Sequence, residues 1–157
     1  MRSSAGVLLF RRASGIEVLL GHMGGPLWAR KDLGGWSIPK GEYDPEAEDA
    51  RAAARREFTE ELGLPVPDGE WIELGEVRYG SGGSRKELTV WAVEANLDTA
   101  QVNPGTFEMQ WPPRSGRMQR FPEVDRAEWF DTTVARDKLS AGQRPCLDRL
   151  VEHLAPG

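Results

Sequence analysis

The segment from Gly41 to Leu64 constrains the fold of this chain more than any other, because it joins a turn to a helix rich in acidic residues. Asp44 is a favourable N-cap, Pro45 suits the first helical position, and Gly63 is a typical helix stop. The sequence between them is rich in alanine, a strong helix former. We therefore expect a helix that begins near Pro45 and ends before Gly63.

Three glutamates, Glu57, Glu60 and Glu61, lie at positions i, i+3 and i+4 of this helix, so they share an arc of roughly 100°. A separate apolar stripe consists of Ala50, Ala54, Phe58 and Leu62. The stripe predicts burial against a sheet, which leaves the acidic face accessible. Crowded carboxylates repel one another unless cations screen them, and Mg²⁺ binds through a few carboxylates together with substrate phosphates. The pattern indicates a Mg²⁺ site, with Mn²⁺ as the alternative ion.

A solvated helix, with Arg55 and Arg56 in surface salt bridges, is the simpler interpretation of an acidic composition. The order of the residues argues against it. Arg56 to Leu64 reads REFTEELGL and resembles, at every fixed position, the second half of the Nudix hydrolase signature, R-E-U-x-E-E-x-G-U, in which U is aliphatic or aromatic.

The first half of the signature is also present, with one departure. Gly41 resembles the glycine that opens the signature, and Glu48 lies eight residues before Arg56, where the family has its first glutamate. The spacing between Gly41 and Glu48 is one residue longer than in the family. Either the loop bulges, or Glu46 takes part in the site.

The resemblance implies an α/β (mixed α+β) fold of the Nudix type, an α/β/α sandwich with a mixed sheet and the loop-helix signature at one sheet edge. It also implies a Mg²⁺-dependent hydrolase that splits a diphosphate linkage. The implied metal ligands are Glu57, Glu60, Glu61 and the carbonyl of Lys40. Arg56 is expected to orient these carboxylates rather than to touch substrate.

In several family members a glutamate outside the signature approaches the metals or acts as the base. The segment from Glu123 to Phe130 resembles a common Nudix ending, in which acidic residues precede a strand. Glu123 is therefore the first choice for this role, and Glu108 is the second.

The chain of 157 residues has the length of one domain, so we expect a single domain over residues 1–157. Its net charge of −5 argues against a long nucleic acid partner. Cys146 is the only cysteine, which excludes an intrachain disulfide and fits a reducing, cytoplasmic location. The apolar run near the N-terminus is too short for a signal peptide or a membrane span. The sequence is compatible with either a monomer or a homodimer.

Apolar runs elsewhere predict the strands of a central sheet. We expect strands over residues 7–10, 16–20, 71–79 and 87–95, with residues 7–20 forming a hairpin. Residues 21–37 are rich in glycine and predict a loop. Helical spacing predicts a short helix over residues 132–139 and another helix after Gly142.

The prolines and glycines of residues 102–122 predict an irregular loop, and its aromatic and basic residues suggest that it caps the substrate. Trp111 would then stack on a ring and Arg114 would face phosphates. Trp28 could also stack on a base, and the ammonium of Lys40 could contact phosphate.

Tyr79 lies fifteen residues beyond Leu64. Family members that cleave dinucleoside polyphosphates asymmetrically carry a tyrosine at nearly this distance, and they often read P-K-G at the signature entrance, as Pro39 to Gly41 does. The resemblance therefore favours a dinucleoside polyphosphate as substrate. Removal of pyrophosphate from a (deoxy)nucleoside triphosphate is the alternative reaction. A nucleotide-sensing module that has lost turnover is the non-enzymatic alternative.

Overall fold

The computed structural model describes residues 2–156, without the side chain of Ser84. Seven strands form the main sheet, and two further strands form a separate hairpin. The strands of the main sheet are β1 (Arg2–Arg12), β2 (Ile16–Met23), β3 (Trp36–Ser37), β4 (Lys40–Glu42), β5 (Trp71–Tyr79), β6 (Lys86–Glu94) and β9 (Val124–Asp131). The hairpin consists of β7 (Thr106–Gln110) and β8 (Met118–Pro122). The helices are α1 (Ala50–Leu62), α2 (Thr132–Lys138) and α3 (Arg144–Leu154).

The main sheet is mixed. Its central order is β3-β2-β1-β6-β5, with β4 paired to β1 and β9 paired to β2. Strands β1 and β6 run parallel over nine residue pairs, from Arg2 opposite Lys86 to Phe10 opposite Glu94, and the other pairings are antiparallel. Residues 4–6 of β1 pair with β4, and residues 10–12 pair with β2, so β2 and β4 lie along the same edge of β1 at different heights.

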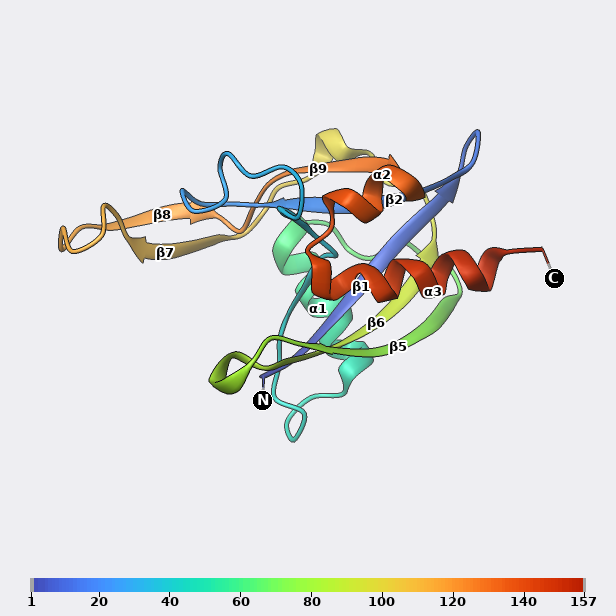
Figure 1. Cartoon of the computed structure of the whole chain (residues 1–157), viewed down its shortest axis with the longest axis horizontal. Coiled ribbons are helices and arrows are strands. Elements are labelled where there is room, and N and C mark those ends of the chain that lie inside the picture. Colours follow the sequence, from blue (N-terminus) through green and yellow to red (C-terminus); the bar gives the residue numbers. More distant parts are fainter. Residues whose placement is uncertain (1, 157) are drawn as a thin grey trace.

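Helices cover both faces of the sheet (Figure 1). Side chains alternate along β1, so that Val7 and Leu9 pack in the cluster with α1, whereas Leu8 and Phe10 pack in the cluster with α2 and α3. All four are completely or almost completely buried. A strand buried on both faces reads as a continuous apolar run, which is why the sequence V-L-L-F belongs at the centre of the sheet. The predicted α/β/α sandwich is confirmed.

The start of the signature helix differs from the prediction. Helix α1 begins at Ala50, because Asp49 is the N-cap and accepts a hydrogen bond from the amide of Ala52 at 3.2 Å. Asp44 instead accepts from the amide of Glu46 at 3.0 Å and so closes a turn ahead of the helix. The expected start near Pro45 was wrong, because residues 45–48 form this turn rather than the first turn of the helix.

The segment over residues 102–122 is also more regular than predicted. It forms the hairpin β7–β8, in which Phe107 pairs with Phe121 and Glu108 pairs with Arg120. Pro112, Pro113 and Gly116 lie in the connection between the strands, whereas Pro122 ends β8 opposite Thr106. Figure 1 shows the hairpin extending away from the main sheet. The prediction of an irregular loop was wrong, because alternation in two five-residue strands is a weak signal beside turn residues.

Gly63 ends α1 in the left-handed conformation, with φ of 72° and its amide bonded to the carbonyl of Thr59. A Cβ at this position would lie 2.0 Å from the carbonyl oxygen of Asn103. We expect Gly63→Ala to lower the free energy of unfolding by at least about 1–2 kcal/mol from the backbone conformation alone. Urea denaturation measures the change. Gly15→Ala is the matched control, since nothing lies within 4 Å of its Cβ position, and an equal loss in both variants would contradict this account.

Candidate active site

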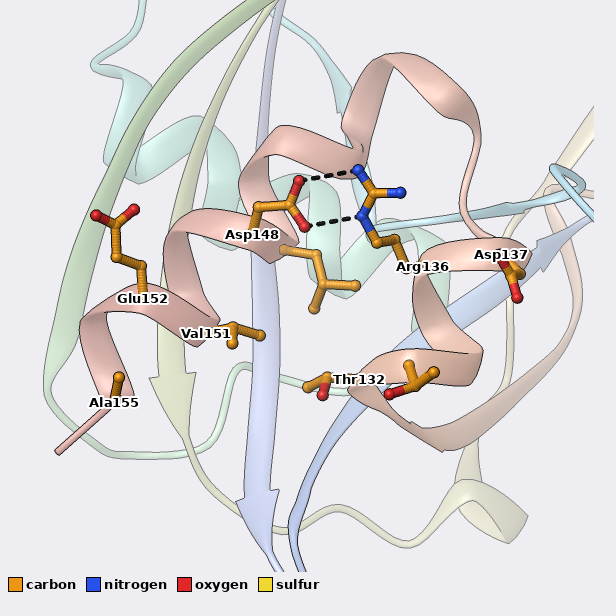
Figure 2. A pocket seen from close by; sticks show the side chains of 9 residues that line it. Thr132, Arg136, Asp137, Asp148, Val151, Glu152 and Ala155 are labelled. Carbon is orange, nitrogen blue, oxygen red and sulfur yellow. Dashed lines mark hydrogen bonds and ion pairs between the residues drawn. The ribbon is translucent and has the colours of Figure 1, made fainter.

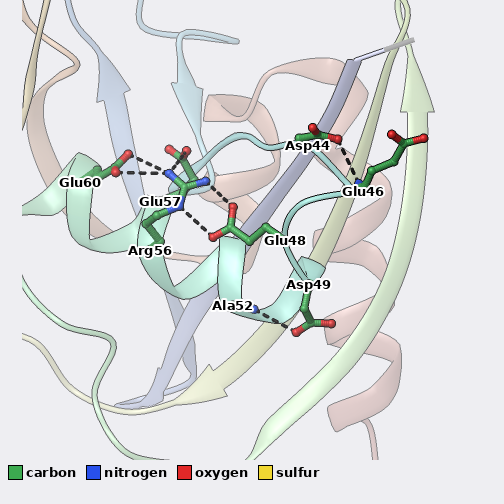
Figure 3. A network of polar contacts seen from close by, with 8 residues as sticks. All are labelled: Asp44, Glu46, Glu48, Asp49, Ala52, Arg56, Glu57 and Glu60. Carbon is green, nitrogen blue, oxygen red and sulfur yellow. Dashed lines mark hydrogen bonds and ion pairs between the residues drawn. The ribbon is translucent and has the colours of Figure 1, made fainter.

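The acidic face of α1 is organised around Arg56. The guanidinium donates to both carboxylate oxygens of Glu48, from Nε at 2.9 Å and from Nη2 at 2.7 Å. Its Nη1 donates to Glu57 Oε1 at 2.7 Å and to both oxygens of Glu60 at 3.2 Å (Figure 3). These hydrogen bonds lower the pKa of Glu48 and raise the pKa of Arg56. One cation therefore holds three carboxylates together, as expected for a residue that orients the site.

The longer loop leaves Glu48 in place. Glu48 makes the bidentate ion pair with Arg56, whereas Glu46 is exposed and contributes only its backbone amide to the turn at Asp44. Figure 3 shows the Glu46 side chain pointing away from Arg56. Of the two alternatives, the structure shows the bulged loop.

Glu57 is buried against β4. Only 9% of the residue is exposed, and a Cβ built on Gly41 would lie 1.8 Å from Glu57 Oε2. The carboxylate thus occupies the space that any side chain at position 41 would fill. Burial raises the pKa of Glu57, while its hydrogen bond to Arg56 lowers it in part. A glycine in β4 is what allows a charged group to approach the strand so closely.

Glu61 also contributes to the contact between α1 and β4. Its Oε2 accepts a hydrogen bond from the backbone amide of Lys40 at 3.2 Å. Burial raises the pKa of Glu61 to about 8, although the positive charge of Lys40 opposes the shift, and the nearby charges of Glu123 and Glu57 raise it further. Burial also lowers the pKa of Lys40. These groups lie close enough to influence one another strongly.

Glu123 faces the same region from the loop between β8 and β9. Its amide donates to the carbonyl of Gly105 at 2.8 Å, and its carbonyl accepts from the amide of Gly24 at 3.0 Å. Gly105 in turn donates to the carbonyl of Glu60, which fixes this loop to the end of α1. Burial raises the pKa of Glu123, with a further contribution from Glu60. The backbone of Glu123 is therefore held from both sides.

A cavity of about 340 Å³ opens beside these groups. Its lining residues are Gly21, Met23, Gly24, Trp28, Ser37, Lys40, Glu61, Phe107, Glu123 and Val124. The structure therefore brings four predicted residues together, namely Trp28, Lys40, Glu61 and Glu123. The Glu57 carboxylate lies against Gly41, the residue after Lys40. The carbonyl of Glu60 accepts a hydrogen bond from Gly105, whose own carbonyl binds the amide of Glu123. Phe107 also lines the cavity. Its place in an aromatic-rich segment was the only sequence signal for it.

Three predicted substrate contacts and the alternative base lie outside this cavity. Trp111 and Arg114 are at the connection of the β7–β8 hairpin, and Glu108 pairs with Arg120 along the hairpin. Tyr79 packs on Gly142 on the face covered by α3, and burial raises its pKa. None of these four side chains reaches the lining of the cavity.

A larger cavity, of about 460 Å³, lies between α2 and α3 (Figure 2). Leu147 and Val151 supply its apolar lining, and Arg136 pairs with Asp148 at its edge at 3.0 Å. It lies on the face of the sheet opposite α1 and contains none of the acidic residues of the signature. This cavity is the larger of the two, but the smaller cavity is lined by Glu61 of the signature and is therefore the candidate active site.

The donor chemistry of the acidic site fits a divalent metal ion. Carboxylate oxygens are the ligands that Mg²⁺ and Mn²⁺ prefer. Burial is the main cause of the raised pKa values of Glu57 and Glu61, and the charges of neighbouring glutamates add to it. Within residues 2–156, no three acidic, histidine or cysteine side chains are arranged to hold an ion as they stand. Glu57 and Glu60 are directed at Arg56, so metal binding requires these hydrogen bonds to be exchanged.

The family follows from comparison with known proteins. A sequence model of the NUDIX domain matches residues 1–150. The chain belongs to the Nudix hydrolase family. Members generally use a divalent metal, and membership makes this chain a pyrophosphohydrolase. No curated protein sequence matches it.

Solved Nudix structures share this fold. The Ap4A hydrolase of C. elegans, in a binary complex, has a TM-score of 0.69 and 22% identity over 98% of both chains. The MutT protein from Methanosarcina mazei Go1 has a TM-score of 0.64 and 18% identity over 99% of this chain and 96% of that one. RenU, a Nudix hydrolase from M. smegmatis, has a TM-score of 0.62 and 26% identity over 96% and 84%. No helix among residues 2–156 of this Nudix hydrolase is long and apolar enough to cross a membrane.

Gly41→Ala is expected to displace the Glu57 carboxylate while the fold is retained, because the added methyl group clashes with the end of a flexible side chain. Hydrolytic turnover should fall by about 100-fold, the scale of losing one well-placed charged group. Turnover and thermal unfolding are measured together. Full activity in a folded Gly41→Ala protein would show that the position of Glu57 is immaterial.

The raised pKa of Glu61 predicts a pH dependence of stability in the absence of metal. The folded state retains the proton up to about pH 8, whereas an unfolded glutamic acid loses it near its usual value of 4.5. The contribution of Glu61 to stability is therefore greatest below pH 4.5 and is lost as the pH rises to about 8. In urea titrations with EDTA from pH 5 to 9, wild type should lose stability relative to Glu61→Gln. Parallel pH curves for the two proteins would refute the shift.

Proposed function

We propose that this Nudix hydrolase cleaves a diphosphate linkage in a nucleoside polyphosphate, with Mg²⁺ as the cofactor and Mn²⁺ as the alternative ion. One observation carries the proposal: the acidic face of α1 meets a cavity that also has aromatic walls. Glu61 and Glu123 lie on the acidic side of the cavity, and Trp28 and Phe107 supply flat apolar surfaces. A phosphate chain suits the first side, and a nucleobase suits the second.

A divalent ion, when bound by Glu57, Glu60, Glu61 and the carbonyl of Lys40, would neutralise phosphate oxygens and lower the pKa of a water molecule. Arg56 keeps the carboxylates of Glu57 and Glu60 on one side of the helix. The two side chains therefore have fewer rotamers available before they bind the metal ion. The ammonium of Lys40 would add positive charge for the phosphates.

Glu123 is our candidate for the general base. It lines the cavity, and no basic side chain in the described residues lies within salt-bridge distance of it. Burial and the charge of Glu60 raise its pKa, which makes it a better proton acceptor than an ordinary carboxylate. Its backbone is held by Gly105 and Gly24, so the side chain extends from a fixed main chain.

A dinucleoside polyphosphate is the substrate that we favour. Support comes from Pro39 to Gly41 at the entrance of the signature and from the fold shared with the C. elegans Ap4A hydrolase. Pyrophosphate removal from a nucleoside triphosphate is the second candidate. The position of Tyr79 outside the cavity supports it, since Trp28 and Phe107 could enclose one base without a second stacking residue.

A panel of dinucleoside polyphosphates and (deoxy)nucleoside triphosphates, assayed with Mg²⁺ or Mn²⁺ and with products identified by mass spectrometry, tests the proposal. Asymmetric cleavage of a dinucleoside tetraphosphate into a nucleoside triphosphate and a monophosphate is the expected outcome. Release of pyrophosphate from triphosphates alone would select the second candidate. Tight nucleotide binding without turnover would indicate a sensor instead of an enzyme.

Glu57→Gln should reduce turnover by at least about 100-fold, because it removes a charged oxygen where phosphate charge must be balanced. Glu46→Gln is the matched control. It makes the same chemical change in the same segment, and Glu46 is exposed and outside the Arg56 network. Wild-type turnover in a folded Glu57→Gln protein, or equal losses in both variants, would contradict the assigned role.

A further inference from the structure

The loop over residues 24–35 joins β2 to β3 and carries Trp28 to the wall of the cavity. Apolar burial does little to hold this loop, because Leu27 and Leu33 are 68% and 64% exposed. The amide of Lys31 donates to the carbonyl of Trp28 at 3.0 Å, so these two residues belong to one turn. A contact that holds the backbone of Lys31 therefore also restrains the position of Trp28.

His22 fixes Lys31. The imidazole is buried, with 2% of the residue exposed, and its Nε2 donates to the carbonyl of Lys31 at 2.6 Å. Its Nδ1 lies 2.8 and 3.0 Å from the two carboxylate oxygens of Asp125 on β9. A backbone carbonyl can only accept a hydrogen bond, so Nε2 is the donor to Lys31, while Nδ1 faces the Asp125 carboxylate at hydrogen-bond distance. Asp125, His22 and Lys31 thus form one continuous chain of hydrogen bonds.

Asp32 adds a second attachment beside the first. Its carboxylate accepts from Trp36 Nε1 at 2.9 Å and from the ammonium of Lys138, and the Lys138 contact is the main cause of its lowered pKa. The amide of Gly34 donates to the carbonyl of Asp137 at 3.1 Å. The far side of the loop is therefore fastened to β3 and to the end of α2.

The near side of the loop belongs to the cavity. The amide of Gly24 donates to the carbonyl of Glu123, the candidate base. Trp28 is half-buried, and the ammonium of Lys31 lies 5.0 Å from the centroid of its indole ring. The face of Trp28 that a base would contact is thus set by a turn whose Lys31 carbonyl is bound by the buried side chain of His22.

We infer that His22 is a positioning residue for substrate binding: together with Asp125 it fixes the Lys31 carbonyl and so holds Trp28 at the cavity wall. The inference rests on the proposed function, because it treats Trp28 as a surface for the base of a nucleotide. His22 itself touches neither the cavity nor the acidic residues of α1. Its loss should therefore weaken binding of the base and leave the phosphate chemistry in place.

His22→Phe keeps an aromatic ring and removes both ring nitrogens that make these hydrogen bonds. The KM for the nucleotide should rise about tenfold, the scale of losing a hydrogen bond to a charged network, while kcat changes little. His22→Gln can still donate to the Lys31 carbonyl and should recover part of the affinity. Asp125→Ala, at a more exposed position, serves if His22→Phe does not fold, and it should raise KM in the same direction.

Limited proteolysis provides a readout that needs no activity. Trypsin cuts after Arg30 and Lys31 in this loop, and mass spectrometry identifies those two cuts. A loosened loop should be cleaved several-fold faster in His22→Phe. Arg149→Met is the matched control for general destabilisation, because it removes two hydrogen bonds to backbone carbonyls of Leu74 and Glu76, away from the loop. Its cleavage at Arg30 and Lys31 and its KM should stay at the wild-type values.

The outcomes separate this inference from the proposed function. Unchanged KM and unchanged cleavage at Arg30 and Lys31 in folded His22→Phe would overturn the inference even if the enzyme is active. If wild type hydrolyses no nucleotide, the proposed function fails, and the proteolysis result still decides whether His22 holds the loop. A fall in kcat with constant KM would also overturn the inference, because it would place His22 in the chemical step.

Discussion

The close approach of β4 to α1 is the constraint on which the rest of the site depends. Gly41 leaves room for the Glu57 carboxylate beside the strand, and the amide of Lys40 binds Glu61 one turn further along the helix. Both carboxylates are thereby taken partly out of water, which is costly for a charged group unless it is paired. The apolar residues Ala53, Ala54, Phe58 and Leu62, buried on the same helix, provide the packing that holds the charged face there.

Arg56 stabilises this group of carboxylates when no metal ion is bound. It supplies one positive charge to Glu48, Glu57 and Glu60, and the many hydrogen bonds keep it protonated. Removing the guanidinium would leave the buried carboxylate of Glu57 without its hydrogen-bond partner, and an unpaired buried charge is strongly destabilising. Glu61 receives no contact from Arg56 and instead carries the highest raised pKa of the acidic face. In the proposed reaction, a divalent ion would add positive charge beside Glu61 to that of Lys40.

Local patterns predicted the parts of the fold that depend on local physics. The acidic face of α1 and its end at Gly63 follow from helical spacing and from the left-handed preference of glycine. The start of α1 was harder to predict, because Asp44 and Asp49 are both suitable caps. In the structure Asp49 caps the helix, and Asp44 closes the turn before it. Strands as short as β7 and β8 are hard to predict, because five residues are too few for a clear alternation of apolar and polar side chains.

Contacts between distant segments account for the remaining differences at the site. Trp28 and Glu123 meet at the cavity because Gly24 pairs with the carbonyl of Glu123, about one hundred residues away, which no spacing along the chain reveals. Trp111 and Arg114 were assigned to substrate on composition, but an ordered hairpin carries them to its far connection. The chain from Asp125 through His22 to Lys31 also joins three separate segments.

The central claim is that the carboxylates gathered where α1 meets β4 form the cation site. Calorimetric titration of the metal-free protein with Mn²⁺ at pH 7, in two buffers of different ionisation enthalpy, tests it most directly. The account predicts saturable binding with release of protons, since Glu61, with a pKa of about 8, must lose its proton to become a ligand. Absence of binding at millimolar Mn²⁺, or binding with the same heat in both buffers, would contradict it.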